Sequence, residues 1–353
     1  MDEDIKLPKI SVLLPVYNGA EFLQTAIDSI LGQSFSNFEF IIINDASTDN
    51  SENVILSNTD SRIVYVKNEL NLGLIKTLNK GLDICKGEYI ARMDQDDIAL
   101  PTRFEKQVNI LDNHPEIGVC GTCFTFFGYD TQNRVIEHPE NPEQIKIAML
   151  GYCAIGHPTV LLRKKAIQNL RYDVNYQAAE DYEFWSRLLR ITKFYNIQES
   201  LLDYRYHGDN MSIKESGTQS IGSKRTIQNQ LSYLGFDENP LFVQYSEAIF
   251  QTFVRKLESN EFMSLVLFAN ELEIVNQKKQ FYDVNLLKEI IHERLFALYD
   301  KTEKDSFKFY LFLLKHKSEL IKNKSITYNL KIVGKIIVGK KSMQLIRKIR
   351  YTK

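Results

Sequence analysis

The sequence predicts an α/β protein with a mostly parallel central sheet and a helical region behind it. First, short apolar, β-rich runs alternate with stretches of helical spacing along the first third of the chain. Second, polar turns rich in Asn and Asp follow several of these runs. Third, helical spacing dominates beyond about residue 220. At roughly 100–200 residues per domain, the 353 residues predict two domains, or one large α/β domain that carries an appendage.

The first third of the chain repeats a strand–helix order. The runs that predict strands are residues 9–15, 38–43, 62–66 and 88–93. The stretches that predict helices are residues 22–31, 74–84 and 101–113. This alternation implies a mostly parallel sheet that is buried on both faces. Ligands of such sheets bind beyond the carboxyl ends of the strands, where the turns at 15–18, 44–49 and 94–97 fall, so we expect the site there.

Beyond residue 113 the pattern becomes mixed. Short strands are predicted at 117–127, 133–137 and 159–163, and helices at 142–150 and 182–189. The stretch 214–223 is rich in Gly, Ser, Thr and Gln, which is typical of a boundary. We therefore expect a catalytic domain over 1–215 and a helical region over 216–353.

The composition is that of an ordinary globular protein, with 44% apolar and 25% charged residues, which excludes disorder and collagen. The 44 basic and 45 acidic residues nearly balance, but ten basic residues and no acidic one fall within 320–353. The rest of the chain, with 34 basic against 45 acidic residues, has a net charge of −11. A protein with this net negative charge is repelled by the phosphates of a nucleic acid, so we expect no nucleic-acid partner.

The basic segment 320–353 interleaves Ile, Val and Leu with Lys and Arg, as an interfacial amphipathic helix would. We therefore expect it to meet an anionic membrane surface, although Gly334 and Gly339 disfavour a continuous helix. A packed terminal helix with a solvated lysine face, or a frayed tail, fits the pattern equally. No apolar run approaches the roughly 20 residues of a spanning helix, and residues 1–6 do not resemble a secretory signal. We expect a cytoplasmic protein, peripheral on the inner face of the membrane if the tail binds there.

The four cysteines fit a reducing compartment better than a disulfide framework. Cys120 and Cys123 form a CxxC, which Cys153 and His157 could extend to a zinc set. Positions three apart on a strand face opposite ways, however, and no second CxxC follows. The pattern favours small buried side chains over a zinc site.

Three carboxylates crowd the turn Asp94-Gln95-Asp96-Asp97 at the end of a predicted strand. Their mutual repulsion is most readily relieved by a divalent cation, and hard oxygen ligands suit Mg²⁺ or Mn²⁺, which usually bridge to substrate phosphates. The alternative is a solvated acidic turn that caps the following helix. The sequence contains neither a GxxxxGK[ST] loop nor a GxGxxG after a strand, so P-loop kinases and dinucleotide dehydrogenases lose their main support.

Six motifs in order resemble the inverting family-2 glycosyltransferases with a GT-A fold, especially bacterial enzymes that build capsule, O-antigen or other surface polysaccharides. The motifs are SVLLPVYN (11–18), IIINDASTDNS (41–51), NLGLIKTLNKGLDICKGEYIARMDQDD (71–97), GHPTVLLRK (156–164), AAEDYEFWSRLL (178–189) and YRYHGDNMS (204–212). The resemblance covers about residues 1–215. It implies a GT-A domain, a Rossmann-like sheet with helices on both faces, ahead of the helical region.

The resemblance also implies roles for individual residues. Those that it places at the nucleotide-sugar are Pro15, Val16, Tyr17, Asn18, Asp45, Asn71, Lys76, Arg92, Asp94 and Arg205. Those at the Mn²⁺ or Mg²⁺ ion are Asp94, Asp96, Asp97 and His207, and those on the acceptor side are His157 and Ser212. Asp181 matches the general base, with Glu180 beside it. Taken alone, Asp45 and the two acids would suit helix caps, and the histidines would suit hydrogen-bonded surface positions.

The resemblance implies a single displacement that moves a hexose or N-acetylhexosamine from a UDP-sugar to a saccharide hydroxyl, with a β-glycoside as product. The acceptor that it implies is a saccharide, free or linked to undecaprenyl diphosphate. Two alternatives remain at this point: a metal-dependent nucleotidyltransferase or phosphohydrolase, and a non-catalytic glycan-binding protein.

Overall fold

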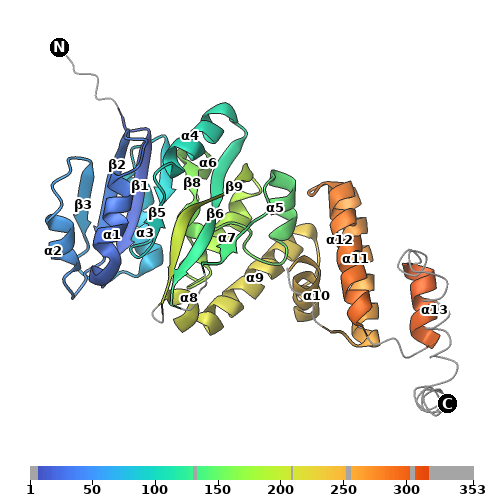
Figure 1. Ribbon diagram of the computed structural model, residues 1–353. Coiled ribbons are helices and arrows are strands. Elements are labelled where there is room, and N and C mark those ends of the chain that lie inside the picture. The colour runs from blue at the N-terminus through green and yellow to red at the C-terminus, as the bar shows by residue number, and fades with distance from the viewer. Residues whose placement is uncertain (1–6, 130–132, 208–209, 252–255, 303–306, 318–353) are drawn as a thin grey trace, which may run out of the picture. The chain divides into compact units, whose positions relative to one another are not determined.

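The computed structural model describes residues 7–129, 133–207, 210–251, 256–302 and 307–317 (Figure 1). The chain divides into two compact units, residues 1–226 and 227–353, and the division falls inside helix α9 (Ser216–Leu234).

The first unit contains one nine-stranded sheet. Its strands are β1 (Ile10–Val16), β2 (Phe38–Asn44), β3 (Ile63–Lys67), β4 (Tyr89–Arg92), β5 (Ile98–Ala99), β6 (Ile117–Gly128), β7 (Val135–Ile136), β8 (Leu161–Arg163) and β9 (Lys193–Tyr206). Its helices are α1 (Ala20–Leu31), α2 (Ser51–Leu56), α3 (Leu74–Ile84), α4 (Arg103–Asn113), α5 (Pro142–Ala148), the 3₁₀ turn η1 (His157–Thr159), α6 (Lys164–Ile167), α7 (Glu180–Leu188), α8 (Met211–Lys214) and the first part of α9.

The strand order is β3-β2-β1-β4-β8-β6-β9-β5, with β7 beside β6. The four strands β3, β2, β1 and β4 pair in parallel, so their carboxyl ends meet at one edge. Beyond them β8 runs antiparallel to both β4 and β6, and β5 runs antiparallel to β9. The α/β prediction is confirmed, and the sheet is mixed where the chain beyond residue 113 enters it.

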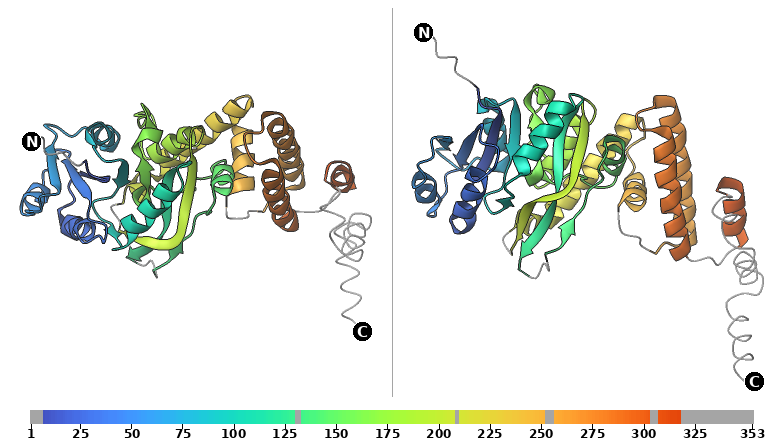
Figure 2. Two further views of the ribbon diagram at one scale, coloured as in Figure 1. Left: turned by 90° about the horizontal axis from the view of Figure 1, so that it is seen from above. Right: turned by 45° about the horizontal axis from the view of Figure 1, so that its top comes forward.

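The two longest strands, β6 and β9, lie side by side in parallel through most of their length (Figure 2). Their register shifts between Thr122 and Cys123 and again by Thr125, which bends the ribbon. Strand β9 was absent from the sequence-based prediction, because polar residues at Gln198 and Glu199 break its apolar run.

Helices cover both faces of the parallel strands. Alternate residues of β1, such as Val12 and Leu14, join a core with the buried side chains of α1 and α4. Leu13 points the other way toward α3, where a side chain at Gly81 would lie 2.2 Å from it, so glycine permits the close approach. The strands predicted at 9–15, 38–43, 62–66, 88–93 and 117–127 and the helices predicted at 22–31, 74–84 and 101–113 are thereby confirmed to within a few residues.

A buried polar link runs from α4 into the middle of the sheet. The Arg103 guanidinium is fully buried and donates to the carbonyls of Arg92 (2.9 Å) and Val160 (3.3 Å). Gln107, one turn further on, donates to the carbonyls of Cys120 (2.6 Å) and Thr159 (2.8 Å). Burial lowers the pKa of Arg103 to about 9. One helix therefore holds the end of β4, η1 and β6 together.

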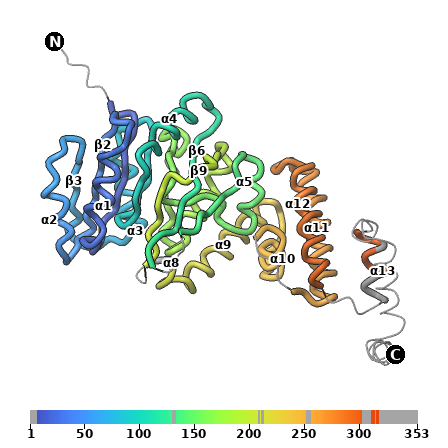
Figure 3. Tube along the Cα trace, in the orientation of Figure 1, coloured from blue at the N-terminus to red at the C-terminus, as the bar shows by residue number. Residues whose placement is uncertain are grey.

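The second unit is helical in its described residues. It contains the rest of α9, α10 (Pro240–Phe250), α11 (Ser259–Lys279), α12 (Val284–Lys301) and α13 (Phe307–His316). Helices α11 and α12 lie side by side (Figure 3) and bury Leu272 and Ile291. No helix of the described chain is long and apolar enough to cross a bilayer. The helical prediction for this region is confirmed there, whereas the basic segment 320–353 lies outside the described residues.

Candidate active site

A cavity of about 1220 Å³ opens at the carboxyl edge of β1, β2 and β4, where the sequence predicts the site. Fourteen of the predicted site residues line it: Pro15, Val16, Tyr17, Asn18, Asp45, Asn71, Lys76, Arg92, Asp94, Asp96, His157, Glu180, Asp181 and His207. Asp97 and Arg205 lie behind this lining. The side chain of Ser212 lies outside the described residues.

The loops after β1 and β2 are tied to each other by side-chain hydrogen bonds. Asn18 N donates to Ser47 Oγ (3.1 Å), and Thr48 N donates to Asn18 Oδ1 (2.8 Å). Gly19 N donates to Ser51 Oγ at the start of α2 (2.9 Å). Asn18 takes a left-handed conformation (φ 48°), which Asn tolerates better than most residues. The two loops form one wall of the cavity.

Asp45 shapes the neighbouring loop at 71–73. Its buried carboxylate accepts from Asn68 Nδ2 (2.7 Å), Leu72 N (2.9 Å) and Gly73 N (2.9 Å). A carboxylate has about four lone-pair sites, so roughly one stays open toward the cavity. Asp45 thus orders the backbone around Asn71 and still offers an acceptor to a ligand.

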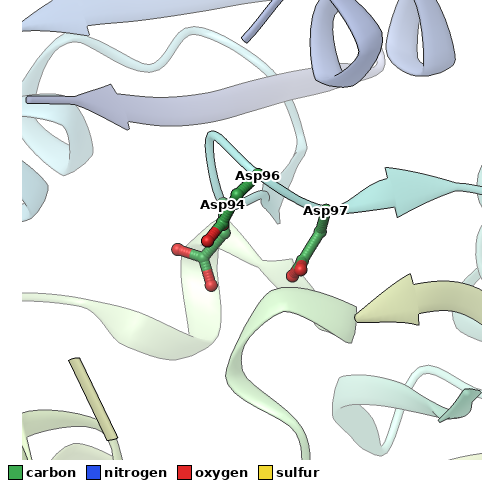
Figure 4. Close-up of side chains that lie close together, drawn as sticks. All are labelled: Asp94, Asp96 and Asp97. Atoms are coloured by element: carbon green, nitrogen blue, oxygen red, sulfur yellow. The ribbon is translucent and has the colours of Figure 1, made fainter. Parts of the chain in front are cut away.

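The tight turn before β5 brings the carboxylates of Asp94, Asp96 and Asp97 close together (Figure 4). Asp94, Asp96 and Asp97 each offer an oxygen, and these oxygens lie within 4.8 Å of one another. Asp94 pairs with Arg92, and Asp96 Oδ2 lies 2.9 Å from His207 Nε2. Asp97 accepts from Arg205 N (2.9 Å) with one oxygen, while its Oδ2 is buried without a hydrogen-bond partner among the described residues.

Electrostatics disfavours this cluster when it carries three negative charges. Burial and the charges of Asp94 and Asp96 raise the pKa of Asp97 well above its usual range. Burial also raises the pKa of Asp94, and Arg92 offsets part of that rise. Hard oxygen donors and an unpaired buried Oδ2 suit Mg²⁺ or Mn²⁺, which would remove the repulsion. Among the described residues this is the one group of His, Cys, Asp and Glu side chains that could hold a metal ion.

A second pair of acids, Glu180 and Asp181, begins α7 on another side of the cavity. Burial and the charge of Asp181 raise the pKa of Glu180 to about 7, and in the part of the chain that the structure describes its Oε2 has no hydrogen-bond partner. Burial raises the pKa of Asp181 as well, although the amide of Tyr182 donates to its Oδ1 (2.7 Å). Cys153 Sγ lies 4.0 Å from Asp181 Oδ2. A carboxylate so weakly solvated is suited to take up a proton.

Arg92 is the buried cation that acts on both acidic groups. Burial alone would lower the pKa of its guanidinium, but the paired Asp94 carboxylate outweighs this and the pKa is raised. The positive charge of Arg92 also lowers the pKa values of Glu180 and Asp181, against the larger effect of their burial. The two acid groups therefore share one counter-charge.

His157 and Arg205 are positioned by aromatic neighbours. His157 Nε2 lies 3.0 Å from Tyr172 Oη, and burial holds the pKa of the imidazole well below its usual range, so the ring is neutral. The Arg205 guanidinium stacks over the rings of Phe22 (4.3 Å) and Phe127 (4.5 Å) and donates to Asp96 O (2.8 Å). Arg205 is thereby bound to the backbone of the carboxylate turn.

Several cavity residues were missed from the sequence. Phe124, His138, Cys153 and Tyr204 line the cavity, and burial lowers the pKa of His138 to about 4. His138 lies in the turn before α5, where no pattern distinguishes it from a surface residue. Phe124 was placed on a predicted strand but not at the site. Cys120 and Cys123, the CxxC pair, are free thiols buried in β6.

Comparison with known proteins gives one consistent result. The glycosyl transferase family 2 model matches residues 11–171. An uncharacterized glycosyltransferase of Haemophilus influenzae is 28% identical over 345 residues, 94% of this chain and 97% of that one. WfaP of Escherichia coli, a UDP-Glc:α-D-GlcNAc-diphosphoundecaprenol β-1,3-glucosyltransferase, is 31% identical over 232 residues, 61% of this chain and 87% of that one. Bacillus subtilis EpsE, a putative glycosyltransferase, is 33% identical over 225 residues, 61% of this chain and 78% of that one.

A solved structure shares the fold. The structure of S. aureus TarS 1–349 in complex with UDP-GlcNAc superimposes with a TM-score of 0.55 at 15% identity, over 83% of this chain and 91% of that chain. At so low an identity the likeness concerns the fold, and it agrees with the mixed sheet and helices described above.

Proposed function

This chain belongs to glycosyltransferase family 2, and from that premise we propose that it transfers a hexose or N-acetylhexosamine from a UDP-sugar to a hydroxyl of a saccharide, with inversion. The observation that carries the proposal is one cavity lined by two separate acid groups, Asp94 with Asp96 and Glu180 with Asp181. The first suits a metal–diphosphate and the second a proton acceptor. A reaction in which a nucleotide leaves while a hydroxyl attacks needs both.

On the donor side we propose that Pro15, Val16, Tyr17 and Asn18 flank the nucleoside. Asp45 would accept from the uracil with its remaining lone pair, and Asn71 and Lys76 would meet the base and ribose. Asp94, Asp96 and Asp97, with His207, would hold Mn²⁺ or Mg²⁺, and Arg92 and Arg205 would balance the diphosphate. A bound divalent ion would offset the negative charge on the departing UDP.

On the acceptor side we propose that Asp181 accepts the proton of the attacking hydroxyl. The hydroxyl oxygen then forms a bond to the anomeric carbon as the bond from that carbon to the UDP oxygen breaks. A single displacement inverts the centre, so an α-linked UDP-sugar gives a β-glycoside. Glu180, at a pKa of about 7, would be placed to hydrogen-bond the acceptor, and His157 and Ser212 would belong to the acceptor side.

The cavity has room for two substrates. Single-ligand pockets are typically about 300–1,000 Å³, whereas this cavity measures about 1220 Å³. WfaP, by its name, acts on a diphosphoundecaprenol-linked saccharide. We extend this to the present chain and propose a lipid-diphosphate-linked acceptor in surface-polysaccharide synthesis.

We further propose that residues 1–215 form the catalytic domain and that the basic segment 320–353 binds an anionic membrane surface, where such an acceptor resides. Deleting 320–353 should then move the protein from the pellet to the supernatant when it is sedimented with vesicles containing anionic lipid. Equal recovery of the intact and truncated chains in the supernatant would contradict the membrane proposal and leave the catalytic one standing.

The catalytic proposal is tested by UDP release from a panel of UDP-hexoses and UDP-N-acetylhexosamines, with a short-chain lipid-diphosphate α-GlcNAc as acceptor. Release should require Mn²⁺ or Mg²⁺, depend on the acceptor, and give a β-linked product by NMR. A protein that turned over nucleoside triphosphates or simple phosphoesters without transferring sugar would refute it.

A further inference from the structure

Gln95 stands between two of the clustered carboxylates, yet its side chain is bound to a different loop. Tyr17 N donates to Gln95 Oε1 (2.9 Å), and Gln95 Nε2 donates to Tyr17 O (3.2 Å). The side-chain amide of Gln95 therefore both accepts from and donates to the backbone of one residue, Tyr17. Such a reciprocal pair fixes the distance and the orientation between the turn at 94–97 and the loop after β1.

Among the described hydrogen bonds, this pair is the side-chain link between the carboxylate turn and residues 17–20. That loop is in turn bound to the loop after β2 through Asn18 and Ser47. Asp45, at the end of β2, then holds the amides of Leu72 and Gly73. Hydrogen bonds, joined by short stretches of backbone, thus link the proposed nucleoside pocket to the proposed metal ligands, and Gln95 makes the link between the two loops.

Gly19 gives independent support for this role. Its backbone (φ −108°, ψ 11°) does not require glycine. A side chain there would, however, place its Cβ 2.4 Å from Gln95 Oε1 and 2.5 Å from Gln95 Cδ. A side chain at position 19 would therefore displace the Gln95 amide from its place beside Tyr17.

We propose that Gln95 is a positioning residue that couples nucleoside binding to metal binding by joining the Tyr17 loop to the carboxylate turn. This rests on the proposed function, because it assigns the nucleoside and the metal to those two loops. Metal binding should order the turn at 94–97, and through Gln95 it should order the wall against which the nucleoside packs.

Uridine is the ligand to use for the test, because it has no phosphate that could contact a metal ion. Any effect of Mn²⁺ on the Kd of uridine must therefore pass through the protein. In the wild-type chain, saturating Mn²⁺ should lower the Kd of uridine by about fivefold, the lower end of the range for coupled sites. Gln95→Met keeps the length and volume but removes the amide, and it should bring the ratio close to one. Gly19→Ala, which displaces the same amide, should do likewise, and combining the two should add little.

The matched control is Gln24→Met on the exposed side of α1, which should keep the wild-type ratio. Thermal unfolding of all variants checks that they are folded. A Mn²⁺ effect on uridine that is equal in wild type and Gln95→Met would overturn the coupling, and so would no effect in wild type. In either case UDP release by the wild-type chain shows whether the proposed function stands, so the two failures are distinguishable.

Discussion

Each acidic group of the cavity contains two carboxyls of raised pKa, Asp94 with Asp97 and Glu180 with Asp181, and the two groups differ in what could lower that pKa. The Asp94–Asp97 turn gathers three carboxylates within 4.8 Å, so repulsion between like charges adds to the effect of burial there. Glu180 and Asp181 are two neighbours at a helix start, where fewer carboxylates gather and burial is again the largest cause of the raised pKa. The repulsion in the first group falls when a cation binds, whereas the cost of burying charge in the second falls when a proton binds.

Position in the sheet explains this difference. The three-carboxylate turn ends β4, a parallel strand whose carboxyl edge is the usual place for a charged ligand. Glu180 and Asp181 follow Ala178, which is held at φ 61°, and start a helix packed with aromatic side chains such as Phe184 and Trp185. We therefore expect the first group to bind an ion and the second to accept a proton.

The largest expected effect is that of Asp181→Asn. Without the proton acceptor, transfer to the acceptor should fall by about 10²–10⁴-fold, the usual contribution of general base catalysis. The Kd of UDP in the presence of Mn²⁺ should stay near that of wild type, since Asp181 is not among the proposed metal ligands. The measurement is acceptor-dependent UDP release together with calorimetric titration of UDP. Wild-type transfer by the variant would show that the proton goes elsewhere.

Asp96→Asn should act on the opposite group. Losing a residue that only hydrogen-bonds to a metal ligand already weakens metal binding by roughly tenfold or more. Losing a charged ligand itself should therefore weaken Mn²⁺ binding by at least that factor. Because metal and diphosphate bind together, the KM of the UDP-sugar should rise, and high Mn²⁺ should recover part of the activity. Asp28→Asn, exposed on α1, is the matched control and should change neither quantity. Unaltered Mn²⁺ dependence in Asp96→Asn would place the metal at another site.

Glu180→Gln should change the pH dependence of stability. The folded-state pKa of about 7 lies above the ordinary value of 4.5, so the folded chain binds more protons than the unfolded chain between these pH values. The wild-type free energy of unfolding should therefore fall as the pH rises from about 4.5 to about 7, by at most about 1.4 kcal/mol per pH unit. The variant cannot titrate at this position, so its curve should be flatter.

Urea unfolding at several pH values measures both curves, and the difference between wild type and Glu180→Gln isolates this group from the others that titrate. As the pH rises, the variant should lose less of its low-pH free energy of unfolding than the wild type loses. Parallel curves for the two proteins would mean that Glu180 has an ordinary pKa in the folded chain, and would contradict the contrast between the acid groups.

Local pattern was sufficient to predict the carboxyl-edge turns. The runs at 9–15, 38–43 and 88–93 are regular, and parallel strands must end on the same side, so the turns after them had to converge. The predicted α/β class and transferase family follow from those segments. The rival classes, a nucleotidyltransferase or phosphohydrolase and a non-catalytic glycan-binding protein, lose their support through membership of a glycosyltransferase family.

Features that depend on distant contacts were not predictable. Strand β9 pairs in parallel with β6, and the hydroxyls of Thr125 and Ser200, which are hydrogen-bonded across the two strands, lie 75 residues apart in the sequence. The sequence of β9 itself does not alternate cleanly between apolar and polar residues. The partners of Asp45 come from a loop after another strand, which no local spacing shows. His138 reaches the cavity only because Gln198 and Asn196 hold its turn through the carbonyls of His138 and Pro139. In each case the missing information is tertiary.

The buried link from α4 has a consequence for how the protein exchanges amide hydrogen with solvent. Arg103 holds the carbonyl of Arg92, and the amides of Arg92 and Met93 donate to Val160 and Leu13 in the core. Backbone amides that are hydrogen-bonded in the core in this way exchange only when the whole unit unfolds. The residues directly before the carboxylate turn therefore belong with the slowest-exchanging part of the chain, so the site can keep its charges close together without local melting.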